Sequence, residues 1–267
     1  MSIAVRLARA ATGRDAVAFC GYHGWHDWYL AANLGESTSL DGHLLPGLDS
    51  TGVPRGLRGT MIPFHYGRLD ELEAIVDARG GELAAVVMEP LRSSEPPAGF
   101  LEGVRALATR AGAALVFDEV TSGFRLLSGG AHLRYGVQPD VAVFAKGMSN
   151  GYPMAAVIGT AGVMEAAQGS FISSTYWTER IGPTAALATI VKHRRERVHE
   201  HLIALGTRVQ DGWAALARRH GLHVHVGGIA PLGHLKFEYP NALAVRTLFT
   251  QLMLDRGILA TVCACMA

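Results

Sequence analysis

The chain has 267 residues, of which 49% are hydrophobic and 18% charged, and its formal net charge is +1 at pH 7. This composition excludes a disordered chain, and the near-balance of 24 basic and 23 acidic residues gives no indication of a nucleic-acid-binding protein or of charge-driven membrane binding. A chain of this length can bury a sizeable core as one large α/β domain or as two smaller domains.

The three cysteines, Cys20, Cys263 and Cys265, match neither a disulfide framework nor a zinc site, so we expect a reducing compartment, the cytoplasm. No uninterrupted apolar run reaches about 18 residues, so we expect no transmembrane helix. The arginine-rich start of the chain superficially resembles a transit peptide, but its apolar residues recur at helical spacing, which favours an internal helix.

Helical and strand patterns alternate along the first part of the chain. In chain order we expect a helix over Ile3–Ala11, a strand over Ala16–Cys20, a surface loop over Gly35–Arg58, a helix over Leu69–Ala78, a strand over Leu83–Met88, a helix over Leu101–Ala111, and strands over Ala113–Phe117, Val141–Phe144 and Ala155–Gly159. Short apolar strands separated by helices indicate an α/β fold with a mostly parallel sheet covered by helices on both faces.

The pattern changes after Pro183, where one long helix or two in succession should extend from Thr184 to His220. We then expect strands near His223–Val226 and His234–Phe237, a helix over Ala242–Arg256 and a strand over Ile258–Val262. We therefore interpret residues 1–190 as a large α/β domain and residues 191–267 as a connecting helix and the start of a smaller α+β domain.

Polar side chains follow three of the predicted strands, at the sheet edge where parallel sheets bind ligands. They are Glu89, Asp118 with Glu119, and Lys146, one of only three lysines in the chain. Burial would lower the pKa of Lys146 and make its amine a nucleophile suited to Schiff-base chemistry. The alternative is a lysine that extends from the strand end into solvent.

A carboxylate such as Asp118 at the end of a buried strand must be paired or hydrogen-bonded. A protonated pyridine nitrogen is one suitable partner, and capping of the following turn is the alternative role. The aromatic segment Gly21–Trp28 follows the first strand and could stack on a planar cofactor, or simply pack as a loop. His23 and His26 have no third ligand in the sequence, so we expect no metal site.

Several short motifs follow one another along the chain in a characteristic order. They are Arg-Leu-Ala-Arg at residues 6–9, Tyr-His-Gly at 22–24, Glu-Pro at 89–90, Asp-Glu-Val-x-x-Gly-Phe-Arg at 118–125 and Ala-Lys-Gly-x-x-x-Gly-Tyr-Pro at 145–153. With this set the chain resembles the class III, fold-type-I, pyridoxal-phosphate-dependent aminotransferases, and among them the glutamate-1-semialdehyde aminomutase-like branch. The resemblance covers nearly the whole chain, which looks truncated at both ends relative to that family.

The resemblance implies a role for each matched residue. Lys146 would form the Schiff base with pyridoxal 5'-phosphate and move the proton, and Asp118 would pair with the pyridine nitrogen. Val120 would pack under the cofactor ring, and Tyr22 would stack over it.

Three further positions match the family near the cofactor. His23 and Glu89 would lie beside it, and Thr178 would bind the cofactor phosphate of a neighbouring subunit, which implies a homodimer. The resemblance thus implies transamination between a small-molecule amino donor and a keto acid or aldehyde acceptor. Intramolecular amino transfer by an aminomutase and a catalytically inert fragment are the alternatives.

Overall fold

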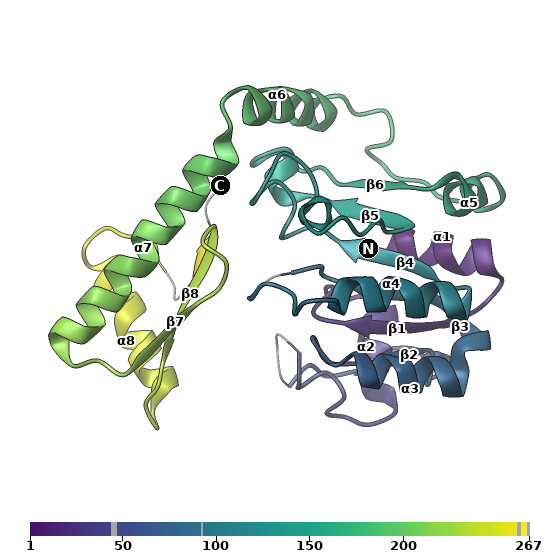
Figure 1. Ribbon diagram of the computed structural model, residues 1–267, viewed down its shortest axis with the longest axis horizontal. Coiled ribbons are helices and arrows are strands. Elements are labelled where there is room, and N and C mark those ends of the chain that lie inside the picture. Colours follow the sequence, from purple (N-terminus) through teal and green to yellow (C-terminus); the bar gives the residue numbers. More distant parts are fainter. Residues whose placement is uncertain (44–46, 92, 261–262, 266–267) are drawn as a thin grey trace.

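The computed structural model describes residues 1–43, 47–91, 93–260 and the backbone of 263–265. Its elements are α1 (Ser2–Thr12), β1 (Ala16–Cys20), α2 (Asp27–Leu30), β2 (Met61–Pro63), α3 (Leu69–Arg79), β3 (Leu83–Met88), α4 (Phe100–Ala111), β4 (Ala114–Asp118), β5 (Val141–Phe144), β6 (Ala156–Gly159), α5 (Ala161–Met164), α6 (Ile181–Arg195), α7 (Val198–His220), β7 (Val224–Gly227), β8 (Leu232–Phe237), α8 (Ala242–Leu254) and β9 (Cys263–Cys265). Figure 1 shows a body built on the first six strands and an arm formed by α7, β7, β8 and α8.

The larger sheet has the strand order β2-β1-β3-β4-β5-β6, in which the first five strands are parallel. This confirms the predicted mostly parallel sheet. The predicted last strand is present as β6, but it runs antiparallel to β5. Residues 145–155, which join the two strands, are too few for a parallel crossover, which needs about a dozen residues or more.

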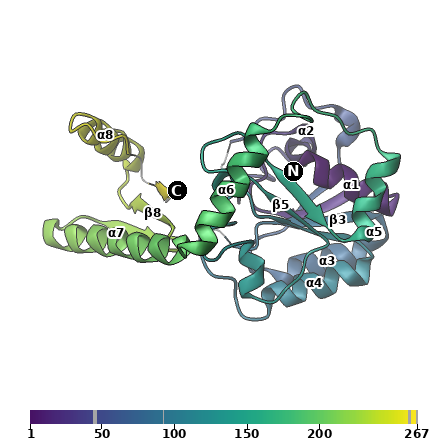
Figure 2. The same ribbon diagram turned by 90° about the horizontal axis from the view of Figure 1, so that it is seen from above.

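Strands β1, β3, β4 and β5 are buried on both faces, whereas the edge strand β6 is partly exposed. Figure 2 shows α3 and α4 on one side of the sheet and α1 on the other. Alternate residues of β1 belong to different cores because side chains alternate along a strand. Val17 and Phe19 pack with Leu7 of α1, whereas Ala18 packs with Leu72 of α3 and Leu101 of α4. Continuous apolar strands are therefore explained by helices on both faces.

The C-terminal part differs from expectation in detail. Two helices, α6 and α7, cover the predicted helical stretch, and they part at Arg197, whose φ is +52°. The expected division at residue 190 falls inside α6. We therefore propose that the two domains divide between α6 and α7, at Arg197. The predicted strand over Ile258–Val262 is wrong for residues 258–260, because antiparallel pairing with β8 places β9 at Cys263–Cys265. Residues 261–262, and residues 44–46 of the predicted loop, lie outside the described residues.

The short strand β2 was not predicted, because three residues ending in a proline carry little periodicity. No helix within the described ranges is both long and apolar enough to cross a membrane.

Arg14 joins three elements at the end of the sheet opposite the predicted ligand edge. Its Nη1 lies 2.6 Å from the carbonyl oxygen of Ala111, 3.2 Å from that of Leu83 and 3.5 Å from that of Gly80. These carbonyls belong to the end of α4, the start of β3 and the segment after α3. A single guanidinium therefore donates to partly buried carbonyls of three segments.

We expect Arg14→Met to lower the free energy of unfolding by about 2–3 kcal/mol, because partly buried carbonyls lose a charged donor. Urea denaturation would measure this change. Arg58→Met is the matched control, because Arg58 is an exposed arginine near the same end of the sheet and should leave the midpoint unchanged. Equal midpoints for both variants would contradict the assigned role of Arg14.

Candidate active site

The carboxyl ends of β1, β3, β4 and β5 meet at one edge of the sheet because these strands are parallel and adjacent. Tyr22 and His23 follow β1, and Glu89 follows β3. Asp118 is the last residue of β4, and Lys146 begins the turn after β5. The topology thus brings five of the predicted site residues to the same edge.

Asp118 and His23 form a buried pair, with 4% and 3% of their surfaces exposed. His23 Nδ1 lies 2.8 Å from Asp118 Oδ2, and the backbone N–H of Val120 donates to Oδ1 at 3.0 Å. Burial by itself raises the pKa of Asp118, but the hydrogen bonds and charge of His23 and the Val120 N–H outweigh it and hold that pKa below its ordinary value. Asp118 is therefore an ionised carboxylate inside the protein, and it also caps the following turn.

The imidazole of His23 is fixed on all sides. Its Nε2 lies 3.0 Å from the carbonyl oxygen of Cys20, so both ring nitrogens face an oxygen atom. The ring stacks on Trp28 at 6.2 Å between centroids and meets the edge of Tyr29 at 5.9 Å. The packing of Trp28 and Tyr29 thus orients His23 toward Asp118.

Sequence analysis left open whether Lys146 is buried or extends from the strand end into solvent. The residue is exposed, which agrees with the second alternative, and its φ is +47°. The strand ends at the buried Phe144, and the left-handed backbone turns Lys146 away from the core. Its Nζ donates to Thr121 Oγ1 at 3.0 Å, so a hydroxyl rather than burial positions the amine. A positive φ at a non-glycine residue is strained, and such strain concentrates at functional sites.

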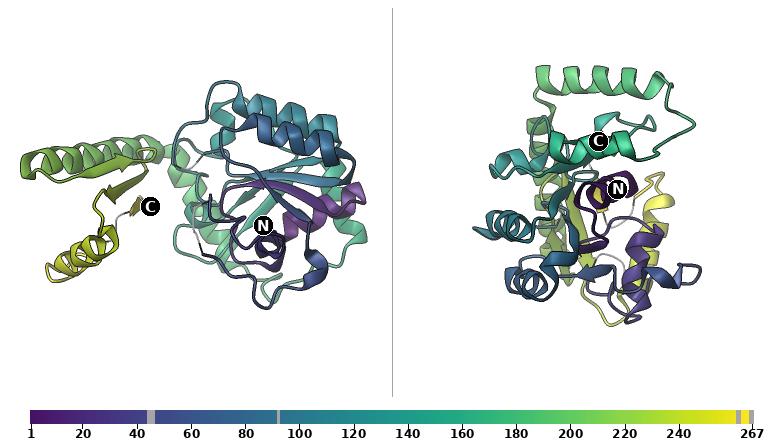
Figure 3. Two further views of the ribbon diagram at one scale, coloured as in Figure 1. Left: turned by 90° about the horizontal axis from the view of Figure 1, so that it is seen from below. Right: turned by 90° about the vertical axis from the view of Figure 1, so that its right-hand side faces the viewer.

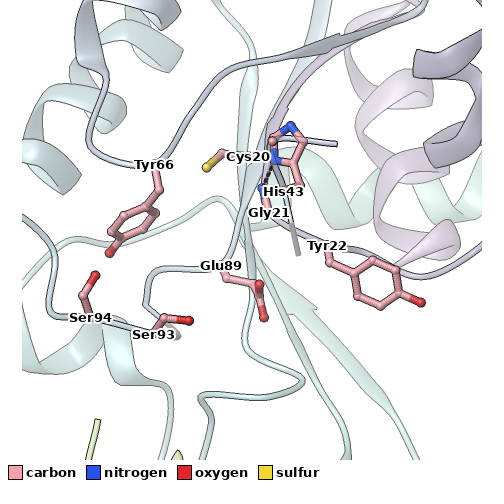
Figure 4. A pocket seen from close by; sticks show the side chains of 9 residues that line it. Cys20, Gly21, Tyr22, His43, Tyr66, Glu89, Ser93 and Ser94 are labelled. Carbon is pink, nitrogen blue, oxygen red and sulfur yellow. Dashed lines mark hydrogen bonds between the residues drawn. The ribbon is translucent and has the colours of Figure 1, made fainter. Parts of the chain in front are cut away.

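A cavity of about 320 Å³ opens between the ends of β1 and β3, and Tyr22 and Glu89 both line it. Figure 4 shows Glu89 with Tyr22 on one side and Ser93 and Ser94 on the other. Cys20 also lines the cavity, and burial and then the nearby Glu89 raise the pKa of its thiol to about 12. This part of the wall is therefore uncharged, and the cavity offers hydroxyls, a thiol and one carboxylate.

His43 closes the same cavity near β1. Its Nδ1 accepts a hydrogen bond from the backbone N–H of Gly21 at 3.2 Å, and its ring stacks on His65 at 5.7 Å. Burial, followed by repulsion from His65, lowers the pKa of His43 to about 4. A neutral His43 thus holds the backbone next to Tyr22. Sequence analysis missed it because it lies in the long loop, where no periodic pattern marks it.

A second buried network lies beside Asp118. Glu119 Oε1 accepts from the backbone N–H of His132 at 2.9 Å and lies 2.8 Å from its Nδ1. Ser122 Oγ donates to Glu119 Oε2 at 2.5 Å. These bonds fold the segment after β4 back on the strand end. Glu119 could be noticed from its place beside Asp118, but nothing in the sequence marked His132 as its partner.

Two predicted residues have simpler surroundings. Val120 is half-buried next to Asp118, and Thr178 lies in an exposed turn. Within the described residues, Thr178 hydrogen-bonds none of the other predicted site residues. No cluster of three or more His, Cys, Asp or Glu side chains able to hold a metal ion is found in the described part of the chain.

Comparison with known proteins places this geometry in context. The profile of the family described as aminotransferase class-III matches residues 3–265. The 3-aminobutyryl-CoA aminotransferase of Cloacimonas acidaminovorans is 33% identical over 257 residues, which are 94% of this chain and 58% of that protein. The glutamate-1-semialdehyde 2,1-aminomutase of Syntrophobacter fumaroxidans is 35% identical, over 96% of this chain and 62% of that protein. The chain thus spans about 60% of the length of these curated relatives.

Solved structures agree with the sequence comparison. The FumI protein of Sphingopyxis sp. MTA144, solved in its PLP internal aldimine form, has a TM-score of 0.85 at 26% identity and covers 98% of this chain and 61% of its own. An omega-transaminase from Sphaerobacter thermophilus has a TM-score of 0.86 at 24% identity, over 100% of this chain and 66% of its own, and shares the fold.

We expect stability to fall as the pH drops from 6.5 toward about 4, because the unfolded chain binds a proton at His43 that the folded chain resists. His43→Gln keeps an acceptor for the Gly21 N–H but does not titrate, so this variant should lose less stability over the same window. Urea midpoints at both ends of the window measure the difference. Identical pH slopes would contradict the role of His43.

Proposed function

The chain belongs to the class-III aminotransferase family, and from this premise we propose that the whole protein transfers an amino group with pyridoxal 5'-phosphate as its cofactor. The family and the fold-type-I architecture that the motifs predicted are thereby confirmed. The reaction is a proposal because the chain spans only part of its relatives' length.

The observation that carries the proposal is the ionised, buried Asp118 at the sheet edge that also holds Lys146. A protonated pyridine nitrogen needs a carboxylate acceptor, and each oxygen of Asp118 accepts one hydrogen bond and keeps a further lone pair. Asp118 therefore provides the hydrogen-bond acceptor that the protonated ring nitrogen of the cofactor requires. When bound, pyridoxal phosphate supplies a carbonyl carbon for the amine and a ring that takes up the electron pair released from a Cα–H bond.

Each side chain at the site would have its own role in the proposed reaction. Lys146 would hold the cofactor covalently through Nζ and move the proton, and Thr121 Oγ1 would orient that nitrogen. Asp118 would keep the ring nitrogen protonated, with His23 holding Asp118 in place and ionised. Tyr22 and Val120 would contact opposite faces of the ring, and Glu89 would line the side of the site that faces the cavity.

The substrates would be a small-molecule amino donor and a keto acid or aldehyde acceptor. Intramolecular amino transfer is the second candidate, favoured by the relative that is a 2,1-aminomutase at 35% identity. The same residues serve both reactions, so the products distinguish them. An inert fragment of such an enzyme is the remaining alternative. The buried free thiol of Cys20 suits a reducing compartment, and we propose the cytoplasm.

We further propose that the protein acts as a homodimer. Large apolar side chains are exposed along residues 171–191, and Figure 3 shows α6 on the outside of the molecule. They are Phe171, Tyr176, Trp177, Ile181, Leu187 and Val191. An apolar surface of this kind marks an interaction site. Thr178 lies within it, which is consistent with a threonine that serves the site of the other subunit.

Borohydride reduction of the 267-residue protein in excess pyridoxal phosphate should fix the cofactor to Lys146, as peptide mapping would measure. Lys146→Met should lose the label, whereas Lys236→Met, which removes another of the three lysines, should keep it. A label on Lys192 or Lys236 would contradict the assignment. A protein that takes up no label at all would favour the inert fragment.

Sedimentation of the wild-type protein should show a dimer, and Leu187→Asp should convert it to a monomer because a charge enters the apolar surface. Leu243→Asp is the matched control, since Leu243 on α8 is 76% exposed and Leu187 is 67% exposed. A monomeric wild-type protein, or equal dissociation by both variants, would rule out dimerisation through α6.

A further inference from the structure

A second cavity, of about 310 Å³, lies between the turn after β5 and the junction of α6 with α7. Phe124, Arg125 and Gly147 line one side, and Lys192 and His193 from the end of α6 line another. Sequence analysis assigned it no role, and the proposed amino transfer does not use it. Gly147 directly follows Lys146, so this cavity borders the same turn as the candidate site.

The lining of this cavity is cationic. Arg125 is only 6% exposed, and its Nε donates to the carbonyl oxygen of Thr121 at 3.4 Å, while Lys192 also lines the cavity. Among the described residues that line the cavity there is no Asp or Glu. Glu196, at the end of α6, does not line the cavity; it accepts a hydrogen bond from Arg195 at 2.7 Å, and its carboxylate also interacts with the charge of Lys192. A small anion would therefore meet two cations and no lining carboxylate.

The first turn of α7 adds to this field. Val198, the first residue of this 23-residue helix, lines the cavity, and no side chain caps the helix N-terminus. The positive end of the helix dipole thus borders the same cavity as Arg125 and Lys192 and favours a negative charge, and Glu200 in the first turn, paired with Arg197, already places one carboxylate at this helix end.

His193 forms a neutral part of the cavity wall and bonds to the segment after β4. Its Nε2 lies 3.0 Å from the carbonyl oxygen of Phe124, and its Nδ1 lies 2.8 Å from Ser128 Oγ. Both nitrogens are engaged, and burial lowers the pKa of the ring. His193 therefore holds the cavity's shape and leaves the charge to Arg125 and Lys192.

The remaining walls are apolar. Phe124 is 9% exposed and Leu202 is 4% exposed, and both line the cavity with Val198. We propose that this cavity binds a small organic carboxylate, with its carboxylate on Arg125 and Lys192 and its hydrocarbon part against Phe124, Val198 and Leu202. Arginine suits this ligand because its planar guanidinium matches a carboxylate. The proposal does not depend on the proposed amino transfer.

The test is a calorimetric titration of the 267-residue protein with butyrate, with acetate, 1-butanol and inorganic phosphate as comparison probes. Butyrate should bind saturably and more tightly than acetate, because acetate lacks the hydrocarbon part, and 1-butanol should not bind. Lys192→Met should weaken butyrate by about tenfold or more, since it removes one charge-assisted hydrogen bond. Lys192 is exposed, so this variant should fold normally.

Arg194→Met is the matched control, because Arg194 is an exposed cation on the same helix and does not line the cavity. It should leave butyrate affinity unchanged. Absence of saturable butyrate binding, equal weakening by the two variants, or tighter binding of phosphate than of butyrate would each overturn the proposal.

Discussion

The buried carboxylate of Asp118 is the feature on which the rest of this site depends. A charge inside the protein is costly unless it is paired, and His23 and the Val120 amide provide that pairing. The requirement extends outward, because His23 must itself be held. Trp28 and Tyr29 pack on its ring, and the Cys20 carbonyl takes its second nitrogen. Trp28 and Tyr29, which follow β1, thus help to position an acidic residue at the end of β4.

Buried carboxylates also hold the segment after β4 in place. Asp118 faces the loop after β1, whereas the adjacent Glu119 anchors the segment's own fold through Ser122 and His132. Between these anchors lies Thr121, whose hydroxyl receives the amine of Lys146. Two neighbouring carboxylates therefore have different tasks, one toward the ligand edge and one toward the loop. The strained backbone at Lys146 is held between these fixed points.

The surfaces left open are as informative as the core. The central strands of the six-stranded sheet are buried on both faces, but α6 exposes large apolar residues, and α8 has no buried residue within the described part of the chain. Exposed apolar surface of this extent is what an interface requires. In this chain, which spans about 60% of its curated relatives' length, buried strands coexist with helices whose apolar faces are exposed.

The motifs of the sequence carried the resemblance to the family. The sequence by itself also determined β1, β3, β4 and β5, the helices that cover them, and the arrival of Asp118 and Lys146 at one sheet edge. These follow from local periodicity and from the rule that parallel strands end together. Only the tertiary structure decided that His23 holds Asp118, that Glu119 pairs with His132, and that β6 reverses direction. It also decided that Lys146 is exposed and bonded to Thr121, because sequence reasoning had left burial and exposure of this lysine open. Contacts between residues 13 to 95 positions apart depend on how loops pack, and neither hydrophobic period nor motif spacing encodes that packing.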